Sequence, residues 1–244
     1  MILAPEALDA FKRHALQDYP REAAGVLVGA GYVPCLNVAE NPDRDFAISG
    51  EELARIELEH GRVKAVLHSH PYHPKQAPEH PAEWPSQMDM QCWLRGAVPW
   101  GIAATDGEGI TPLLWLDESA PEPLVGREFV WGVNDCYSLV RDWFKQQRGV
   151  VLPNFAREWR HWDKGVSMYD ELFAGAGFVE ITAEQVQPGD CVLMRLHGSI
   201  SSHAAVVTGP DEILHHLFHR LSGYDRLSKW RRAITKWVRY EGDK

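Results

Sequence analysis

The apolar positions in the first half of the chain follow an alternation of helical and strand periods. Residues three and four apart line one helical face, and short apolar runs bounded by Gly or Pro are typical of strands. The pattern predicts helices at residues 5–19, 51–60 and 85–96, and strands at 22–29, 33–38, 63–67, 98–104 and 110–116. Pro20 ends the first helix and Gly61 caps the second. Residues 72–84 contain three prolines and predict a loop.

The second half begins with a helix and continues with strands. An apolar stripe predicts a helix at residues 137–147. Strands are expected at residues 191–196, 201–207 and 212–215, separated by turns rich in Gly, Pro and Asp. Residues 220–239 interleave aromatic with basic side chains, which predicts a terminal element with a packed aromatic face and a solvated basic face. A contact with an acidic partner is the alternative for that segment.

An acidic stretch with two prolines separates the halves. Residues 119–123 form the best linker candidate, so we expect domains at residues 1–118 and 124–244. The chain has 244 residues, which suits two modest domains. The mixture of helices and strands in each half predicts an α+β protein.

Composition narrows the class of protein. The apolar fraction of 45% and charged fraction of 24% are ordinary for a globular protein, and no run is long enough to span a bilayer. The first residues lack the features of a signal peptide. Four cysteines in a chain of this length do not make a disulfide framework, which favours synthesis in a reducing compartment.

The net charge of −9 is unevenly distributed. Residues 1–118 hold 9 Lys and Arg against 18 Asp and Glu, whereas residues 119–244 hold 16 of each class. The acidic half is a poor binder of nucleic acid. The asymmetry also supports a division into two domains.

Two histidines directly follow the predicted strand at 63–67. Side chains alternate along a strand, so His68 and His70 project from one face. Two imidazoles at a strand end suit a first-row metal ion, zinc most simply. Pairs of this kind also occur without metal, and the sequence alone does not separate the two cases.

Two carboxylates and a hydroxyl strengthen the metal interpretation. Glu22 stands at the mouth of an earlier strand, and Ser86 and Asp89 share the first turn of a helix. Taken singly, Glu22 is an edge-strand charge and Ser86-x-x-Asp89 is a capping box. Taken with the histidines, these residue types predict three metal ligands, a water position, a base to take the proton of that water, and an oxyanion donor.

This set resembles the JAMM (Mov34/MPN/PAD-1) metalloprotease family, whose motif is Glu, then His-x-His-Pro, then Ser-x-x-Asp. The resemblance covers about residues 1–118 and implies a JAMM-type α/β/α domain. It implies His68, His70 and Asp89 as zinc ligands. It also implies Glu22 as general base and Ser86 as transition-state donor.

One departure from the JAMM motif leaves an alternative open. The 15 residues between His70 and Ser86 exceed the usual family spacing. The longer segment contains His73 and His80, either of which is a candidate to replace a ligand.

One cysteine occupies the predicted start of a helix. Residues 134–135 suit a helix N-terminus, which places Cys136 in the first turn. The helix macrodipole there favours the thiolate, the nucleophilic form. A lone cysteine is also often just a small buried apolar residue, and we expect that role for Cys35, Cys92 and Cys191.

Two histidines are expected beside this cysteine. A hairpin of the strands at 201–207 and 212–215 places His203 next to His215, against the start of the Cys136 helix. One imidazole then takes the thiol proton and the other orients it. His216 adjoins His215, and a change of strand register would exchange their roles.

The order Asp-Cys, Pro-Gly-Asp, Ser-His and Ile-Leu-His resembles the NlpC/P60 family of papain-like cysteine peptidases, which act on cell-wall peptides. The resemblance covers about residues 124–244. It implies Cys136 as nucleophile, His203 as general base and His215 as its orienting partner. Tyr137 departs from the pattern, because the family commonly has a serine there.

The pairing of these two domains resembles a family of tail assembly proteins from lambda-like bacteriophages. It implies tail tip proteins and peptidoglycan peptides as partners, no membrane span, and synthesis in the host cytoplasm followed by assembly into a tail tip. The expected activities are cysteine endopeptidase cleavage of peptidoglycan stem peptides, at a γ-D-glutamyl–diaminopimelate type of linkage, and zinc-dependent peptide or isopeptide hydrolysis.

Two alternatives remain open at this stage. One is a structural tail-tip module whose catalytic sites are vestigial or masked, which the long insert after Pro71 and the adjacent His215 and His216 favour. The other is processing of ubiquitin-like conjugates by the JAMM-type half. The accompanying wall-hydrolase pattern argues against the second.

Overall fold

The computed structural model describes residues 3–76, 78–118 and 123–242. The chain divides into two compact units, the first formed by residues 1–85 and 92–119 and the second by residues 86–91 and 120–244. The predicted linker at 119–123 lies outside the described residues except for Pro123, so the exact domain boundaries stay a prediction. Within the described part of the chain, no helix combines the length and the apolar character needed to cross a bilayer.

The first unit is a five-stranded sheet with helices on both faces. Its elements are α1 (Pro5–Asp18), β1 (Ala24–Val28), β2 (Gly31–Cys35), α2 (Gly50–His60), β3 (Val63–Pro71), β4 (Trp100–Thr105) and β5 (Leu114–Leu116). Between β3 and β4 the chain forms α3 (Gln87–Arg95), whose residues up to 91 group with the second unit. The strand order is β2-β1-β3-β4-β5, and β3 and β4 are the one parallel pair among these strands. A single 3₁₀ turn (Pro74–Gln76) interrupts the loop predicted at residues 72–84.

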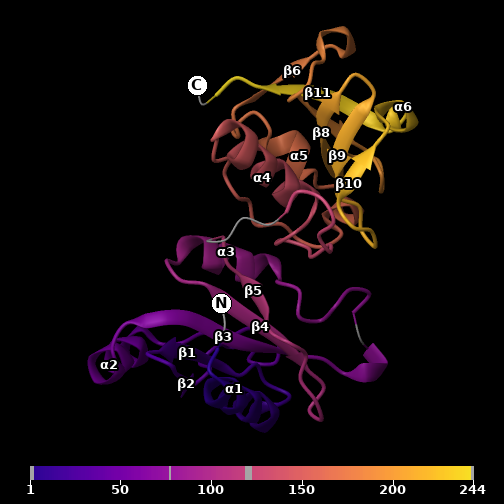
Figure 1. The fold of residues 1–244 in the computed structure, drawn as a ribbon. Helices are drawn as coiled ribbons and strands as arrows, with labels where there is room; N and C mark the ends of the chain where they lie inside the picture. The colour runs from indigo at the N-terminus through magenta and orange to yellow at the C-terminus, as the bar shows by residue number, and fades with distance from the viewer. Residues whose placement is uncertain (1–2, 77, 119–122, 243–244) are drawn as a thin grey trace. The chain divides into compact units, whose positions relative to one another are not determined.

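The two faces of this sheet carry different helices because the strand side chains alternate. Phe11 of α1 packs in a buried cluster with Leu27 and Leu67. Ile56 of α2 packs in another cluster with Val26 and Val28. The helices therefore cover opposite faces, which gives the predicted α/β/α layering (Figure 1).

The second unit is a six-stranded antiparallel sheet with α4 and α5 on one face. Its elements are α4 (Cys136–Arg148), α5 (Met168–Leu172), β6 (Phe178–Ile181), β7 (Cys191–Met194), β8 (His203–Gly209), β9 (Glu212–His215), β10 (Gly223–Asp225), α6 (Leu227–Trp230) and β11 (Ile234–Tyr240). The strand order is β10-β9-β8-β7-β11-β6. The α+β class and the two-domain architecture are confirmed.

Alternation also separates two cores in the second unit. Leu193 and Val206 face α4 and α5 in one cluster, whereas Val192 and Ala205 share the other with Leu227 of α6. The helix α4 lies against β8, and Gly149 ends it in the left-handed conformation with φ 66°.

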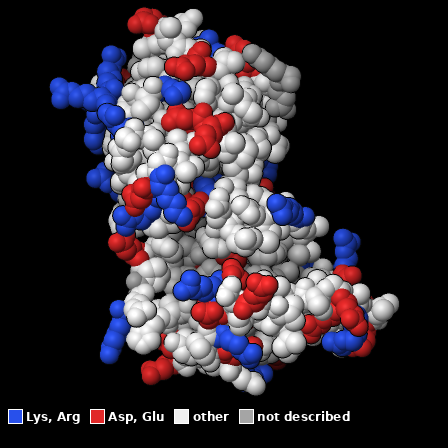
Figure 2. All heavy atoms as spheres, turned by 180° about the vertical axis from the view of Figure 1, so that it is seen from behind, with Lys and Arg blue, Asp and Glu red and all other residues white. Residues whose placement is uncertain are grey.

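The basic run near the C-terminus folds as β10, α6 and β11. Trp230 and Trp237 pack against the core, while Arg226, Arg231 and Arg232 are exposed. Figure 2 shows Lys and Arg side chains gathered along the edge of the second unit where α6 lies. This is the arrangement expected from a packed aromatic face and a solvated basic face.

Candidate active sites

The first candidate site is built on β3 at the centre of its sheet. Antiparallel pairing sets Ala24 of β1 opposite His68, and the backbone N–H of Ser69 donates to the Ala23 carbonyl oxygen at 2.9 Å. Continuing this register places Glu22 opposite His70. The ligand atoms of Glu22, His68 and His70 all lie within 4.8 Å of one another. The sheet thus brings together Glu22 and His68, which are 46 positions apart in the sequence.

The geometry of the histidine pair fits a metal ion. The two Nε2 atoms lie 3.1 Å apart, close to the roughly 3.3 Å expected between two nitrogens on one tetrahedral zinc. Nδ1 of His70 lies 2.8 Å from the Ala82 carbonyl oxygen. A carbonyl only accepts, so this nitrogen carries the hydrogen and the His70 Nε2 lone pair is left for a ligand.

The surroundings of the pair are largely apolar. Phe46 stacks on the His68 ring with centroids 4.4 Å apart, and Trp100 meets it edge-on at 5.7 Å. His68 is fully buried and Glu22 is 4% exposed. A carboxylate and two imidazoles with ligand atoms this close together form a donor set that suits a first-row metal ion.

Ser86 and Asp89 pair with each other at the start of α3. The Asp89 carboxylate accepts from the Ser86 backbone N–H at 2.7 Å, and the Ser86 hydroxyl accepts from the Asp89 N–H at 3.1 Å. This reciprocal bonding is that of a capping box. Within the described residues, the cluster of metal-ligating atoms contains Glu22 and does not contain Asp89.

The two additional histidines of the loop are engaged elsewhere. His80 stacks on Trp84 with an interplanar angle of 8°, and its Nδ1 lies 2.9 Å from the Pro81 carbonyl oxygen. His73 accepts from the Lys75 backbone N–H at 3.2 Å. Neither belongs to the cluster around His68 and His70 that the described residues form.

The second candidate site begins at the N-terminus of α4. Asp135 caps the helix by accepting from the Ser138 N–H at 2.9 Å. Arg157 holds this carboxylate with two hydrogen bonds of 2.6 and 2.9 Å, and both side chains are inaccessible to solvent or nearly so. Burial alone would raise the pKa of Asp135, but the guanidinium outweighs burial and keeps that pKa below its usual range.

Cys136 is the first residue of α4, and its sulfur is enclosed. The side chain is 4% exposed, and Sγ lies 3.0 Å from the Tyr169 hydroxyl. The backbone of Ala204 supplies a second hydrogen bond. Burial raises the pKa of the thiol to about 11, with the Asp135 charge adding to the effect. The helix dipole was expected to favour the thiolate, but desolvation is the larger effect here.

His203 and His215 meet across the neighbouring strands β8 and β9. His203 Nε2 lies 3.2 Å from His215 Nδ1, and His215 Nε2 lies 3.9 Å from the Asp225 carboxylate. Burial lowers the pKa of His203 well below its usual value and that of His215 to about 4, so both rings are neutral at neutral pH. Among the described residues, no hydrogen bond joins the Cys136 sulfur to the His203 ring.

His216 is placed away from this pair. Its Nε2 lies 3.1 Å from the Arg220 carbonyl oxygen, and its ring meets Phe129 edge-on at 5.1 Å. Alternation at the end of β9 therefore directs His215 toward His203 and His216 toward a different contact. The structure brings His215, rather than His216, to the histidine of β8.

Two family models match the chain in the predicted order. Residues 4–116 match the prokaryotic homologs of the JAB domain, and residues 126–238 match the NlpC/P60 family. Along most of its length the chain is similar to the Tail tip assembly protein K of Escherichia phage N15, with 30% identity over 97% of this chain and 95% of that protein.

The chain belongs to the tail tip assembly protein K family. The Tail tip assembly protein K of Escherichia phage lambda is a second relative of this family, 30% identical over 78% of this chain and 88% of that protein. The resemblance to phage tail assembly proteins is thus confirmed, as is the order of a JAB-like domain followed by an NlpC/P60 domain.

Solved structures of the NlpC/P60 type also match this member of the K family. One is a Staphylococcus aureus subsp. aureus Mu50 protein of the NLP/P60 family, 20% identical, covering 52% of this chain and 46% of its own, with a TM-score of 0.36. Another is the NlpC/p60 domain of the peptidoglycan hydrolase SagA, 20% identical over 48% of this chain and 89% of its own, with a TM-score of 0.34.

Sequence reasoning missed two residues of the second site in this K-family chain. Arg157 and Tyr169 lie 21 and 33 positions after Cys136, outside any predicted element. A buried Arg is rare without a carboxylate partner, but nothing in the sequence marks residue 157 as buried. Tyr169 sits in a helix of five residues, too short to give a periodic signal.

Proposed function

We propose that the second unit is a cysteine endopeptidase that cleaves peptidoglycan stem peptides. The observation that carries this proposal is the placement of Cys136 at a helix N-terminus against β8, where Ala204 bonds the sulfur and the preceding residue, His203, pairs with His215. A thiol, a neutral base and a residue that orients the base are the parts required for nucleophilic acyl transfer. The match to the NlpC/P60 family supports the wall peptide as substrate.

The reaction follows from the protonation states of these groups. Neutral His203 accepts the Cys136 proton, and the resulting thiolate attacks the scissile carbonyl to form a tetrahedral species. The imidazolium then protonates the leaving amine, and water hydrolyses the thioester. His215 holds the His203 ring through the 3.2 Å contact. Catalytic contacts often tighten only with substrate bound, and we assign the missing sulfur–imidazole hydrogen bond to that step.

For the first unit we propose zinc-dependent hydrolysis of a peptide or isopeptide bond. His68, His70 and Asp89 are the proposed ligands, and a zinc ion held by them would supply Lewis-acid activation of water and of the scissile carbonyl. Glu22, whose carboxylate lies within 4.8 Å of the histidine ligand atoms, is the proposed general base. Ser86 is the proposed oxyanion donor. The histidine geometry and the match to prokaryotic JAB homologs support this proposal.

We propose other phage tail tip proteins as partners, with assembly in the host cytoplasm and the virion tail tip as the destination. The similarity to two proteins named Tail tip assembly protein K supports this assignment.

A cell-wall zymogram tests the enzymatic proposal. Wild-type protein should clear purified peptidoglycan, Cys136→Ala should lose clearing, and His68→Ala should retain it while losing bound zinc. The matched control is Cys191→Ala, because Cys191 is a similarly buried cysteine on β7 whose sulfur makes no hydrogen bond to His203 or Tyr169 among the described residues. Clearing that persists in Cys136→Ala contradicts the thiol assignment.

One observation favours a second candidate, a structural module with masked sites. The Cys136 sulfur is hydrogen-bonded to Tyr169 rather than to His203, and burial keeps the thiol protonated at neutral pH. Wild-type protein that assembles into tails but never clears peptidoglycan, alone or within the tail, would support this candidate over the peptidase.

A further inference from the structure

A tyrosine that no sequence motif marks touches the proposed nucleophile. The Tyr169 hydroxyl lies 3.0 Å from Cys136 Sγ, and both side chains are almost inaccessible to solvent, at 6% and 4%. A buried hydroxyl at this distance from sulfur forms a hydrogen bond in which either atom can be the donor.

The position of Tyr169 is imposed by its neighbours on α5. Ser167 caps the helix by accepting from the Asp170 N–H at 3.0 Å, and its own hydroxyl donates to the Ser201 carbonyl oxygen at 2.9 Å. Asp170 accepts from the Lys236 ammonium at 2.8 Å. These contacts tie both sides of Tyr169 to the rest of the unit, so its hydroxyl is held against the sulfur.

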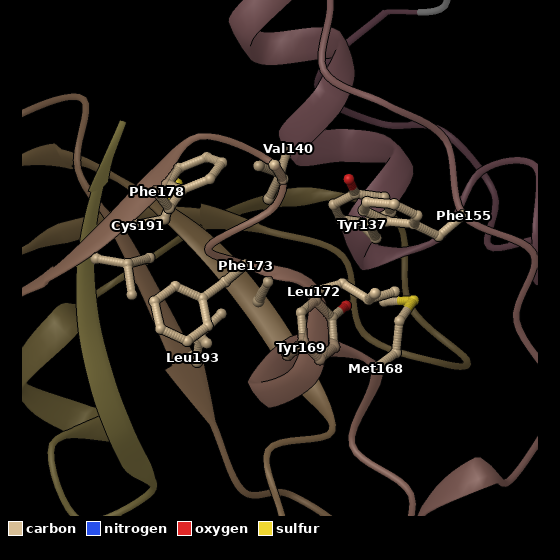
Figure 3. Close-up of a pocket in the computed structure, with 13 residues that line it drawn as sticks. Tyr137, Val140, Phe155, Met168, Tyr169, Leu172, Phe173, Phe178, Cys191 and Leu193 are labelled. Atoms are coloured by element: carbon tan, nitrogen blue, oxygen red, sulfur yellow. The ribbon is translucent and has the colours of Figure 1, made fainter. Parts of the chain in front are cut away.

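A second tyrosine provides an internal comparison. Tyr137 and Tyr169 are equally buried, their rings meet edge-on at 6.2 Å, and both line the apolar recess shown in Figure 3. The Tyr137 hydroxyl donates to the Pro153 carbonyl oxygen at 2.7 Å, a purely structural bond. Of this pair, only Tyr169 directs its hydroxyl to the sulfur.

The direction of the hydrogen bond follows from the chemistry of the two groups. A phenol O–H is a stronger donor than a thiol S–H, and an ionised sulfur can only accept. The Ala204 backbone gives the same sulfur a second hydrogen bond. Once His203 removes the thiol proton, the negative charge forms next to these two donors in an enclosed site where hydrogen bonds to charge are strong.

We propose that Tyr169 is a catalytic residue of the second site, whose hydroxyl donates to the Cys136 sulfur and stabilises the thiolate. The inference rests on the proposed role of Cys136 as nucleophile. The other charged groups that act on the sulfur are Asp135 and Arg157, and this buried pair is neutral overall. The Asp135–Arg157 pair therefore does not compensate for loss of the Tyr169 hydroxyl.

The pH dependence of Cys136 alkylation tests this role without any substrate. Iodoacetamide modification at Cys136 is followed by peptide mass spectrometry, which separates it from the exposed Cys92. Tyr169→Phe should raise the pKa of the thiol and slow alkylation about tenfold at neutral pH, the effect of about one pKa unit. Tyr137→Phe, which removes a hydroxyl bonded only to backbone, should leave the rate unchanged.

The direction of the change in the alkylation rate distinguishes an electrostatic role of Tyr169 from a role in limiting access of the reagent to the sulfur. Removing one oxygen opens space around the sulfur, so a purely steric role for Tyr169 predicts faster alkylation. An unchanged or faster rate in Tyr169→Phe, or an equal slowing in Tyr137→Phe, overturns the proposal.

A fluorinated tyrosine at position 169 keeps the test decisive if the Phe variant does not fold. Fluorination makes the hydroxyl more acidic and a stronger donor, so it should lower the pKa of the Cys136 thiol and speed alkylation. An unchanged or raised pKa contradicts the proposal. The alkylation test and the zymogram can fail separately. If alkylation of Cys136 responds to Tyr169 but wall clearing survives Cys136→Ala, the Tyr169–Cys136 interaction is retained and the peptidase proposal is rejected.

Discussion

Two histidine pairs of nearly equal separation differ in how the surrounding structure holds them. His68 and His70 lie on one strand with their Nε2 atoms 3.1 Å apart, whereas His203 and His215 lie on neighbouring strands with Nε2 and Nδ1 3.2 Å apart. In the first pair, the Ala82 carbonyl fixes the hydrogen of His70 on Nδ1, so Nε2 carries a lone pair that can bind a metal ion. In the second pair, a nitrogen of one ring contacts a nitrogen of the other, which is the arrangement needed if His215 orients His203 as a base.

The two histidine pairs also differ in the carboxylates that lie near them. Glu22 lies among the first pair and supplies negative charge where a cation is proposed to bind. In the second unit the buried carboxylate, Asp135, is one residue from the nucleophile and is neutralised by Arg157. Imidazole spacing alone therefore does not distinguish the proposed metal site from the proposed proton relay. The carboxylates near each pair, Glu22 in the first and Asp225 at 3.9 Å from His215 in the second, are a further difference to test.

The largest expected effect comes from breaking the charge pair beside Cys136. Arg157→Met leaves Asp135 ionised and unpaired in the interior, which should cost the second unit about 3–5 kcal/mol in free energy of unfolding. Urea denaturation of the full chain, followed by circular dichroism, measures the loss. The double variant Asp135→Asn/Arg157→Met should recover part of it, because no charge is then left buried.

A neighbouring ion pair provides the control. Arg160 and Asp163 are bonded on the surface, with side chains 45% and 47% exposed. Arg160→Met should cost less than about 1 kcal/mol. Equal losses for the Arg157 and Arg160 variants would show that the buried pair has no special role in holding the start of α4.

Zinc affinity should separate the roles of Glu22 and Asp89, the two carboxylates proposed to act with His68 and His70. If Asp89 is the third ligand, Asp89→Asn should weaken zinc binding about 100-fold, or about 2.7 kcal/mol, in a chelator competition on the full chain. Glu22→Gln should keep zinc within about tenfold and lose hydrolysis, because it removes a base rather than a ligand. His73→Gln and His80→Gln serve as controls and should bind as wild type.

The opposite result would reassign the site. If Glu22→Gln loses zinc and Asp89→Asn keeps it, the third ligand is the carboxylate that β1 brings to the histidines, and Asp89 acts as a helix cap alone.

The last prediction concerns the acid stability of the second pair. The pKa of His215 is lowered to about 4 by burial, from about 6.5 in an unfolded chain. As pH falls from about 6.5 to 4, the unfolded chain binds a proton that the folded chain does not, so the unfolding free energy falls by about 1.4 kcal/mol per pH unit for this group. His203, whose pKa is also lowered, adds a loss of the same sign.

Unfolding curves at several pH values provide the measurement. His215→Gln should reduce the slope of unfolding free energy against pH by about one proton between pH 4 and 6.5. A slope that stays at its wild-type value would mean that His215 is protonated in the folded protein, and it would remove the basis for treating the pair as a neutral relay.

Elements with strong periodicity were predictable from the sequence. The helix expected at 51–60 is α2 (Gly50–His60) with Gly61 at its C-cap, and the strand expected at 212–215 is β9. The strand expected at 110–116 is shortened to β5 (Leu114–Leu116), because Pro112 offers no N–H to a ladder. Strand alternation also predicted the shared face of His68 and His70.

Other parts of the two sites depend on contacts that periodicity does not encode. Arg157 lies in an irregular stretch, and its bonds to Asp135 exist only once that stretch folds over α4. The state of the thiol also required the structure, because the helix dipole was visible in the sequence and the burial that opposes it was not. The reciprocal hydrogen bonds of Ser86 and Asp89 fit a helix cap, and they also fit an Asp89 that turns to a metal ion when one binds. The sequence alone left the same two alternatives open.

The antiparallel register of β1 and β3 determines when the proposed metal site can form. Ala24 faces His68 only after these strands have paired, and that pairing alone carries Glu22 to the histidines. A nascent or partly folded chain therefore holds no assembled donor set of Glu22, His68 and His70, and the proposed metal site can form only once the two strands have paired.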